Sequence, residues 1–292
     1  MTPTPESAPD SNLQPTAYSL LESFIIVLKG KTAIITGASL GLGRQMALDL
    51  ASRQMNLALA APNQSELAQV GEEVVEKGGN ALVQVTDVTD PEQCKSLIDA
   101  TLKSFQALDC LVLSAGISMW APFEQVTDVS IFRRLMEVNY LGAVHCIHAA
   151  LPYLRKSHGT IVAISSAQAV MSLPLHSGYS ASKHALRGFL ESLELELGDE
   201  LRILDVLPGW IRGTSLRSYA LSADGTNVGH TKRKHNKDSV SVEECSARIV
   251  QAMQGRTRDL YIPSKLRFVP WLKLLAPGWL ASKIRRAVDK QD

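Results

Sequence analysis

The sequence lacks the features that would direct it to nucleic acid, to a metal ion or to an oxidising compartment. In its 292 residues, 30 Lys and Arg residues are balanced by 29 Asp and Glu residues, and the formal net charge is +1. A charge near zero provides no general attraction to nucleic acid. The four cysteines, at positions 94, 110, 146 and 245, form neither a CxxC pair nor a Cys/His cluster at metal-ligand spacing. We therefore expect a cytoplasmic protein with no structural metal and no nucleic-acid partner.

The N-terminal residues lack the basic start of a secretory or transit signal. Residues 1–16 are rich in Pro, Ser and Thr and contain no Lys or Arg, which predicts a disordered tail. The apolar patch from Tyr18 to Leu28 is interrupted by Glu22. It is far shorter than the roughly 20 residues that span a bilayer. We interpret residues 1–28 as a tail followed by a docking helix, and not as a membrane anchor.

The sequence does contain a regular alternation of short apolar runs with helical stretches that carry charged faces. The apolar runs occupy residues 32–35, 57–61, 81–85, 110–113, 160–164 and 203–207. Strands that alternate with helices predict a parallel sheet covered on both faces. A chain of this length can form one large α/β domain. We therefore expect a three-layered, single-domain α/β fold whose catalytic domain covers residues 29–255.

The regularity ends after Pro208. Residues 215–240 are polar and include the basic stretch 232–235, which predicts a substrate loop over the carboxyl edge of the sheet. Helical periodicity returns at residues 242–253. Residues 256–292 contain nine Lys and Arg residues and three Asp residues, interleaved with Leu residues, Trp271 and Trp279. This amphipathic extension suits contact with a membrane or another subunit, or a cap on the substrate pocket of the same chain.

A glycine-rich turn joins the first apolar run to the first helical stretch. The sequence Thr36-Gly-Ala-Ser-Leu-Gly-Leu-Gly43 has the spacing GxxxGxG. Glycines at this place allow the backbone to turn sharply and approach a pyrophosphate, while the helix N-terminus offers unpaired N–H groups. The glycine-rich turn therefore predicts a dinucleotide site. The alternative is a turn whose glycines have only a structural role.

Other positions bear on the same cofactor. Asp87 follows the third run and could accept from an adenine amino group, or cap the next helix. Small residues after the fourth run would let a cofactor lie against the backbone. At the end of the second run, residues 60–63 read Ala-Ala-Pro-Asn and offer neither the acid that binds a free ribose 2′-OH nor a base. Arg44 could reach a 2′-phosphate or could simply be solvated.

Tyr179 and Lys183 are four residues apart at the start of a helical run, and this spacing places them on one helix face. A phenol ordinarily has a pKa near 10 and is a poor base at neutral pH. We expect the Lys183 ammonium, together with an oxidised nicotinamide, to lower the pKa of Tyr179 by about two or three units. The alternative is that Tyr179 and Lys183 are an ordinary pair of helix residues with no catalytic role.

Ser166 precedes Tyr179 by thirteen residues and follows an apolar run directly. Its hydroxyl would emerge at the carboxyl end of a strand, where it could donate to a substrate carbonyl during hydride transfer. Ser165 is its neighbour, and we expect one of the two serines only to satisfy local backbone. Asn139 lies in the middle of a predicted helix, where Asn is unfavourable, which points to a buried polar role.

Together these residues resemble the short-chain dehydrogenase/reductase family over residues 30 to 255. The resemblance depends on the glycine turn, Asp87-Val88, Asn139, Ser166, Tyr179 with Lys183, and Pro208-Gly209, all in the order of the family. It implies a doubly wound sheet of the Rossmann type and a catalytic tetrad of Asn139, Ser166, Tyr179 and Lys183. It also implies that Lys183 holds the nicotinamide ribose, that residues 208–211 flank the nicotinamide, and that Asn139 binds a water in a proton relay.

The sequence departs from the pattern of the family at two places. The usual Asn-Asn-Ala-Gly reads Leu-Ser-Ala-Gly at residues 113–116, so the bonds that normally brace the central strands must be made otherwise. The threonine that often follows Pro-Gly is displaced to Thr214. Residues assigned to the cofactor are Gly37, Ser39, Leu40, Gly41, Leu42, Gly43, Asp87, Val88, Ala115, Gly116, Tyr179, Lys183, Pro208, Gly209 and Ile211.

We therefore predict an NAD(P)-dependent oxidoreductase that interconverts an alcohol and a carbonyl of an apolar substrate, such as a sterol, a retinoid or a lipid. NADP is slightly favoured over NAD. A cofactor-binding sensor or scaffold without turnover is the competing hypothesis. His145 and His148 have no third metal ligand in the sequence, and we expect ordinary core or surface histidines. The family resemblance suggests a homodimer or homotetramer, with the C-terminal segment as a candidate for peripheral membrane contact.

Overall fold

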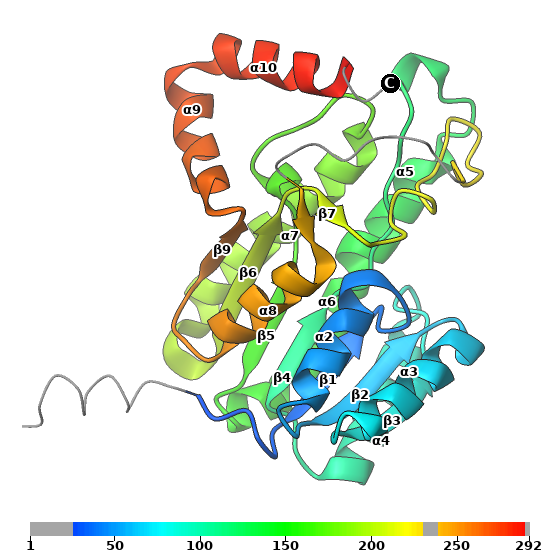
Figure 1. Ribbon diagram of the computed structural model, residues 1–292, viewed down its shortest axis with the longest axis vertical. Coiled ribbons are helices and arrows are strands. Elements are labelled where there is room, and N and C mark those ends of the chain that lie inside the picture. Colours follow the sequence, from blue (N-terminus) through cyan, green and yellow to red (C-terminus); the bar gives the residue numbers. More distant parts are fainter. Residues whose placement is uncertain (1–25, 230–238, 290–292) are drawn as a thin grey trace, which may run out of the picture.

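The apolar runs form one parallel sheet. The computed structural model describes residues 26–229 and 239–289 (Figure 1). Seven strands lie in the order β3-β2-β1-β4-β5-β6-β9, and each neighbouring pair is parallel. Their bounds are β1 Thr32–Thr36, β2 Asn56–Ala61, β3 Asn80–Val85, β4 Cys110–Leu113, β5 Thr160–Ile164, β6 Arg202–Pro208 and β9 Asp259–Ile262. The order runs outward in both directions from β1 and β4, which confirms the predicted doubly wound Rossmann-type sheet.

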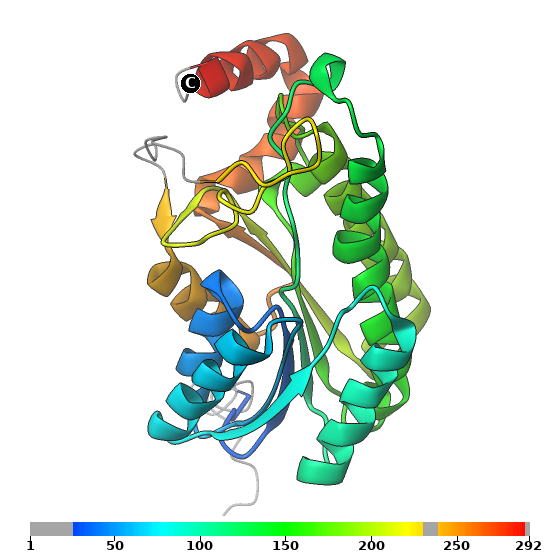
Figure 2. The same ribbon diagram turned by 90° about the vertical axis from the view of Figure 1, so that its right-hand side faces the viewer.

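Helices cover both faces of this sheet, as the alternation predicted. Figure 2 shows the sheet between two helical layers. The helices are α2 Gly41–Ala51, α3 Gln64–Glu76, α4 Pro91–Phe105, α5 Ser130–Met136, α6 Gly142–Lys156, α7 Ser177–Leu197 and α8 Val242–Met253. Side chains alternate along each strand, so Ile35 packs with α2, α3 and α8 while Ile34 packs with α4, α6 and α7. The two apolar cores and the sheet between them make the three predicted layers.

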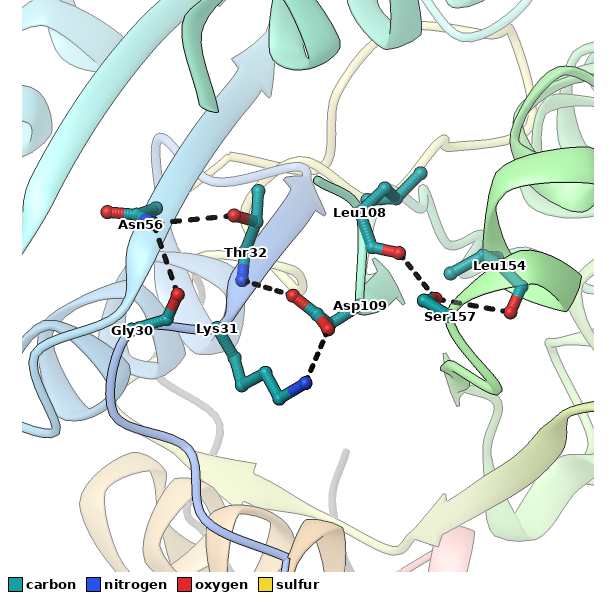
Figure 3. Close-up of polar contacts among 8 residues, drawn as sticks. All are labelled: Gly30, Lys31, Thr32, Asn56, Leu108, Asp109, Leu154 and Ser157. Carbon is teal, nitrogen blue, oxygen red and sulfur yellow. Dashed lines mark hydrogen bonds and ion pairs between the residues drawn. The ribbon is translucent and has the colours of Figure 1, made fainter. Parts of the chain in front are cut away.

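Polar side chains join the strands at their amino ends (Figure 3). The Asp109 carboxylate accepts from the Thr32 N–H at 2.9 Å and from Lys31 Nζ at 2.8 Å, which ties β1 to β4. Ser157 Oγ donates to the carbonyl oxygen of Leu108 at 2.7 Å. These bonds satisfy backbone groups at the rim that the ladders leave unpaired. They fasten this end of the sheet.

The loop that the sequence predicts to cover the substrate pairs with the segment that follows β4. The Trp120 N–H donates to Leu221 O and the Leu221 N–H donates to Ser118 O, each at 2.8 Å. Two short strands, β7 Ile211–Arg212 and β8 Val240–Ser241, join the two ends of the loop. Backbone pairing therefore holds residues 215–229 over the carboxyl edge. The basic stretch 232–235 lies outside the described residues.

The chain beyond residue 255 differs from the sequence prediction. Residues 259–262 form the edge strand β9, which the apolar pattern did not predict. The helices α9 Val269–Leu275 and α10 Pro277–Asp289 follow it at the upper end of the molecule in Figure 1. The division into domains at residue 255 stays a prediction, although the sheet itself continues to Ile262.

Most of the predicted tail and docking helix, residues 1–25, lies outside the described residues. Residues 26–28 are not helical. The Ile26 N–H donates to Gln254 O at 3.1 Å, and Leu28 is buried in the core beside α8. The chain is thus already docked before β1 begins. In the described part of the chain, no helix combines the length and the apolar character that a membrane span requires.

Candidate active site

The glycine turn lies at the carboxyl end of β1, beside the crevice where the strand order reverses. Gly37 has a φ of +64°, and a Cβ there would lie 2.8 Å from the Cα of Ala115. A Cβ on Gly43 would collide with the carbonyl oxygen of Gly37. Both positions therefore require glycine for steric reasons. The backbone surface that results is smooth enough for a ligand to lie against it.

Helix α2 presents a free N-terminus at this turn. Its N-cap, Leu40, makes no side-chain capping bond, and its first turn contains no acidic residue. The helices α3 and α4, by contrast, are capped by the side chains of Asn63 and Asp90. An uncapped helix N-terminus with its positive dipole end suits a phosphate. The residues present therefore fit the pyrophosphate of a dinucleotide.

Thr36 replaces the missing Asn in bracing the central strands. Its Oγ1 accepts from the N–H groups of Ser114 and Ala115 at 3.1 and 3.2 Å. These bonds tie the end of β1 to the segment after β4. The predicted need for a substitute brace is thus met by a side chain from the glycine turn itself. The displaced Thr214 lies above the same turn, with its Cβ 3.5 Å from the position of a Cβ on Gly41.

Ser166 and Tyr179 come together at the carboxyl end of β5. Ser166 emerges directly after β5, and its Oγ accepts from the Gln168 N–H at 3.1 Å. The Ser166 hydroxyl also lies close enough to the Tyr179 hydroxyl to act on the pKa of the phenol. Tyr179, in the first turn of α7, is 7% exposed. Burial raises the pKa of Tyr179 to about 12, although the nearby Ser166 hydroxyl lowers it. The fold thus places the two predicted hydroxyls side by side.

Lys183 lies one turn further along α7, and it is buried, with 4% exposure. Its Nζ donates to Ile164 O at 2.8 Å and lies 5.9 Å from the centre of the Tyr179 ring. Burial lowers the pKa of Lys183 to about 8, and the charge of Asp205 opposes this. We expected Lys183 to lower the pKa of Tyr179. In the protein alone the pKa is raised, because burial disfavours the phenolate.

Asn139 is buried in a π-helical segment, Glu137–Leu141, between α5 and α6. Its Nδ2 donates to Ile117 O and to Ser182 Oγ, both at 2.9 Å, and its Oδ1 accepts from the Ile117 N–H at 2.8 Å. Asn139 therefore clamps the segment after β4 onto α7. A π-bulge in a helix often marks a functional site. This explains why a residue that disfavours helix occupies the middle of a helical stretch.

A small cavity lies between Asn139 and Lys183. About 10 Å³ is open to the centre of a water molecule, which is close to the lower limit for holding one water. Its walls include Thr36, Ala115 and Val88. The cavity thus connects residues of the predicted tetrad with residues assigned to the cofactor.

The remaining residues assigned to the cofactor surround the same crevice. Asp87 is exposed, and its Oδ1 accepts from the N–H and hydroxyl of Thr89 at 2.9 and 2.8 Å. The alternative that Asp87 caps the next helix is wrong, because Asp90 caps α4. Gly116 is near the tetrad: a Cβ there would lie 3.2 Å from Asn139 Oδ1. Pro208 is the last residue of β6, Gly209 follows it, and Ile211 opens β7.

Two side chains lie near the place where the sequence predicts the ribose of the cofactor. Arg44 forms an ion pair with Glu73 of α3, with Nη2 2.6 Å from Oε2, so it is neither simply solvated nor free for a phosphate. Asn63 accepts from the N–H groups of Ser65 and Glu66 as the cap of α3.

In the described part of the chain, His145 and His148 belong to no cluster that could hold a metal ion. His145 Nδ1 lies 3.0 Å from Val88 O.

The sequence prediction missed an aromatic cluster beside Tyr179. The rings of Trp120 and His176 meet edge to face with centroids 4.8 Å apart, and His176 lies 5.8 Å from Trp210 and 6.3 Å from Tyr179. The Arg217 guanidinium stacks over Trp210 at 4.4 Å. These residues come from four separate loops and helix ends. Trp210 could have been found from the sequence, because it directly follows Pro208-Gly209. The positions of the other residues in the sequence do not indicate that they meet.

Comparison with known proteins settles the family. Residues 31–224 match the family described as short chain dehydrogenase. This chain belongs to the short chain dehydrogenase family. The 11-beta-hydroxysteroid dehydrogenase A of Arachis hypogaea is 38% identical over 256 residues, which is 86% of this chain and 73% of that protein. The 11-beta-hydroxysteroid dehydrogenase 1A of Arabidopsis thaliana is 35% identical over 255 residues, with the same shares.

Solved structures of short chain dehydrogenases share the fold. One from Burkholderia phymatum in complex with NAD has a TM-score of 0.73 and 23% identity, covering 86% of this chain and 95% of that one. One from Burkholderia cenocepacia in complex with NADP has a TM-score of 0.72 and 23% identity, covering 89% and 99%. The family and its relatives make this short chain dehydrogenase an NAD(P)-dependent oxidoreductase that interconverts alcohols and carbonyls, as predicted.

Proposed function

We propose that this dehydrogenase transfers a proton through Tyr179 to or from the oxygen of an apolar alcohol or ketone, at a carbon that exchanges hydride with NADP. The observation that supports this most is the buried pair of neighbouring hydroxyls of Tyr179 and Ser166, one helical turn from Lys183. Two hydroxyls that converge at the carboxyl edge of a parallel sheet can bind one carbonyl oxygen between them.

The chain's own residues have separate tasks in this mechanism. Gly37, Gly43 and the N-terminus of α2 would hold the pyrophosphate, and Lys183 would hold the nicotinamide ribose. The nicotinamide, when bound, supplies or accepts the hydride. Ser166 donates a hydrogen bond to the carbonyl oxygen, and Tyr179 delivers the proton as negative charge develops there. A water in the cavity beside Asn139 would then return a proton to Lys183 and Tyr179.

Two features favour an apolar substrate with rings. Tyr179 packs with Met119, Leu221 and other apolar side chains in a cluster under the substrate loop. Trp120 and Trp210 add aromatic surface beside it. Relatives at 34 to 38% identity carry the name 11-beta-hydroxysteroid dehydrogenase, and a steroid-like ketone is therefore a suitable first substrate.

The preference for NADP depends on residues after β2. An acidic residue at this place would repel a 2′-phosphate, and the chain has Pro62 and Asn63 there. Arg44 would have to exchange Glu73 for the phosphate. Affinities measured for NADPH and NADH by quenching of the Trp fluorescence would test this proposal, and tighter binding of NADH would contradict it.

The exposed face of α9 and α10 supports peripheral contact with an anionic membrane. Phe268, Trp271, Leu274, Leu275 and Trp279 are each more than half exposed. Basic side chains lie among them, and Lys283 Nζ stacks over the Trp279 ring at 5.5 Å. Exposed Trp and Leu with surrounding Lys and Arg fit the interface of a membrane. Such contact would bring the substrate loop close to apolar substrates.

For the assembly we propose a homodimer or homotetramer, as the family resemblance suggests.

Turnover tests the proposed chemistry. Purified protein is mixed with NADPH or NADH and a panel of ketones that includes steroid-like and short-chain compounds, and absorbance at the nicotinamide band is followed. We expect turnover that falls by a factor of at least about a thousand in Tyr179→Phe, with cofactor affinity preserved. If nothing in the panel is converted and Tyr179→Phe binds cofactor like the wild type, the sensor hypothesis replaces this one.

A further inference from the structure

A cluster of charged side chains around the buried Asp205 lies against α7 on the sheet side. Arg187 Nη1 contacts Asp205 Oδ2 at 2.7 Å, and its Nη2 contacts Asp259 Oδ2 at 2.8 Å. Arg187 Nε also contacts Glu191 Oε1 at 2.9 Å on the same helix. The Asp205 side chain, from the middle of β6, is 6% exposed. A charge that deep in the sheet is costly, so its partners define what it does.

This cluster adjoins the catalytic lysine. Lys183 and Arg187 are four residues apart and therefore lie on one face of α7. Lys183 Nζ donates to Ile164 O, and Ile164 is paired in register with Val206, the residue after Asp205. Asp205 itself is paired with Ala163, whose side chain packs in the core on the α7 side of the sheet. Asp205 thus faces the turn of α7 that carries both cations.

The charges around Lys183 come from three elements. Tyr179 and Arg187 are on its own helix, and Asp205 is on β6. Arg187 also has Glu191 on α7 and Asp259 on β9 as partners. Burial raises the pKa of Asp205, while contacts with Ser165 and Arg187 lower it. Burial lowers the pKa of Lys183 to about 8, and Asp205 is the charge that opposes this fall.

We propose that Asp205 is a positioning residue that keeps Lys183 in its ammonium form, with Arg187 holding the carboxylate in place. This inference rests on the proposed function of Lys183 as the cation beside Tyr179. Without a negative charge nearby, a lysine buried this deeply loses its proton easily. Asp205 supplies that charge without touching the reacting atoms. A purely structural role, in which the cluster only fastens β9 to α7, is the alternative.

The first test measures protonation without catalysis. Lys183 has a pKa of about 8 in the fold and ordinarily 10.5, so between these values the unfolded chain binds more protons. The contribution of Lys183 to the free energy of unfolding should therefore rise with pH in this window, whereas the contributions of Cys110 and Cys245 should fall, because burial raises the pKa of each thiol to about 12. In Asp205→Asn the pKa of Lys183 falls further, and the rise should begin at a pH lower by about one unit. Urea unfolding at a series of pH values measures it.

The matched comparison is made in a Lys183→Met background. There Asp205→Asn should leave the shape of the pH dependence unchanged, because no lysine remains to titrate at that site. Asp259→Asn also breaks one ion pair of Arg187, whereas the carboxylate that raises the pKa of Lys183 is that of Asp205. Asp259→Asn should lower the free energy of unfolding without shifting the pH at which the contribution of Lys183 begins to rise. An equal onset in the wild type and Asp205→Asn would overturn the proposal.

Kinetics gives the second readout. In the direction of ketone reduction, kcat/KM should fall at alkaline pH as Lys183 loses its proton, and this fall should move to lower pH by about one unit in Asp205→Asn. In Asp259→Asn the alkaline fall of kcat/KM should occur at the same pH as in the wild type. A uniform loss of kcat/KM at every pH in Asp205→Asn would show the structural role and contradict ours. If the wild type reduces no ketone while the unfolding shift is present, the proposed function fails and the coupling to Lys183 stands.

Discussion

At the scale of single residues, burial acts in opposite directions on the two groups of the proposed proton-transfer site. It raises the pKa of Tyr179 to about 12 and lowers the pKa of Lys183 to about 8, so it favours the neutral form of both. At neutral pH the phenol is therefore protonated, as ketone reduction requires. Alcohol oxidation needs the phenolate, and the Lys183 ammonium is the group that can stabilise it.

Ser166→Ala tests the second hydroxyl of the site. It removes the hydroxyl beside Tyr179, which is the proposed donor to the substrate oxygen, and it also removes the acceptor of the Gln168 N–H after β5. We expect kcat to fall by a factor of about 100 to 1,000, as with loss of one oxyanion donor elsewhere. Steady-state kinetics with the best ketone of the panel measures this loss.

Ser165→Ala is the matched control for that substitution. Its side chain adjoins Asp205 and makes no bond to Tyr179. We expect a much smaller loss of kcat. Equal losses in the two variants, or a Ser166→Ala variant as active as the wild type, would remove Ser166 from the mechanism.

At the scale of elements, the glycine turn and α2 act as one unit. The turn is narrow because Gly43 packs against the Gly37 carbonyl, and the N–H groups at the start of α2 are directed by that packing. Gly43→Ala forces the turn open. We expect cofactor affinity to fall by at least about tenfold, because N–H groups displaced from a phosphate lose their bonds. Fluorescence titration with NADPH measures it.

A second glycine provides the comparison. Gly188, in the middle of α7, has open space where a Cβ would lie. Gly188→Ala should bind cofactor like the wild type and should raise the free energy of unfolding by about 0.5–1 kcal/mol, since alanine favours helix. If Gly43→Ala binds NADPH as tightly as Gly188→Ala, the turn is structural and the cofactor lies elsewhere.

Apolar patterns in the sequence predicted the strands β1 to β6 but not the edge strand β9. The runs that formed β1, β2, β4, β5 and β6 were recognisable because both faces of a central parallel strand are buried and therefore apolar. The edge strand β3 is partly exposed, yet it still contains the apolar residues Leu82, Val83 and Val85. The edge strand β9 contains Asp259 and Tyr261, which are partly exposed, so it has no such run. Its place in the sheet depends on pairing with β6 and on the ion pair of Asp259 with Arg187. Neither is a local property of the sequence.

At the scale of the whole molecule, the face of α9 and α10 lies at the carboxyl edge of the sheet. Lys273 Nζ donates to Val170 O at 3.4 Å, in the segment between Ser166 and Tyr179. Replacing Trp271 and Leu275 by Ser should weaken binding to vesicles that contain anionic lipid by at least about tenfold, through loss of buried apolar area. Co-sedimentation with such vesicles and with neutral vesicles measures it.

Leu195→Ser is the control, because Leu195 is exposed on α7, away from this face. It should bind vesicles like the wild type. Light scattering on each protein gives its mass. If the wild type stays in solution with anionic vesicles, the membrane proposal is wrong. If the Trp271 and Leu275 replacements instead halve the mass, the face is a subunit interface.

The sequence by itself determined the layered parallel fold, the glycine turn and the order of Asn139, Ser166, Tyr179 and Lys183, because apolar periodicity and short spacings are local. The tertiary structure alone decided the signs of the pKa shifts, the meeting of Trp120, His176 and Trp210, and the approach of Asp205 to the helix of Lys183. These depend on burial and on contacts between residues far apart in the chain, and neither is written in any short stretch of sequence.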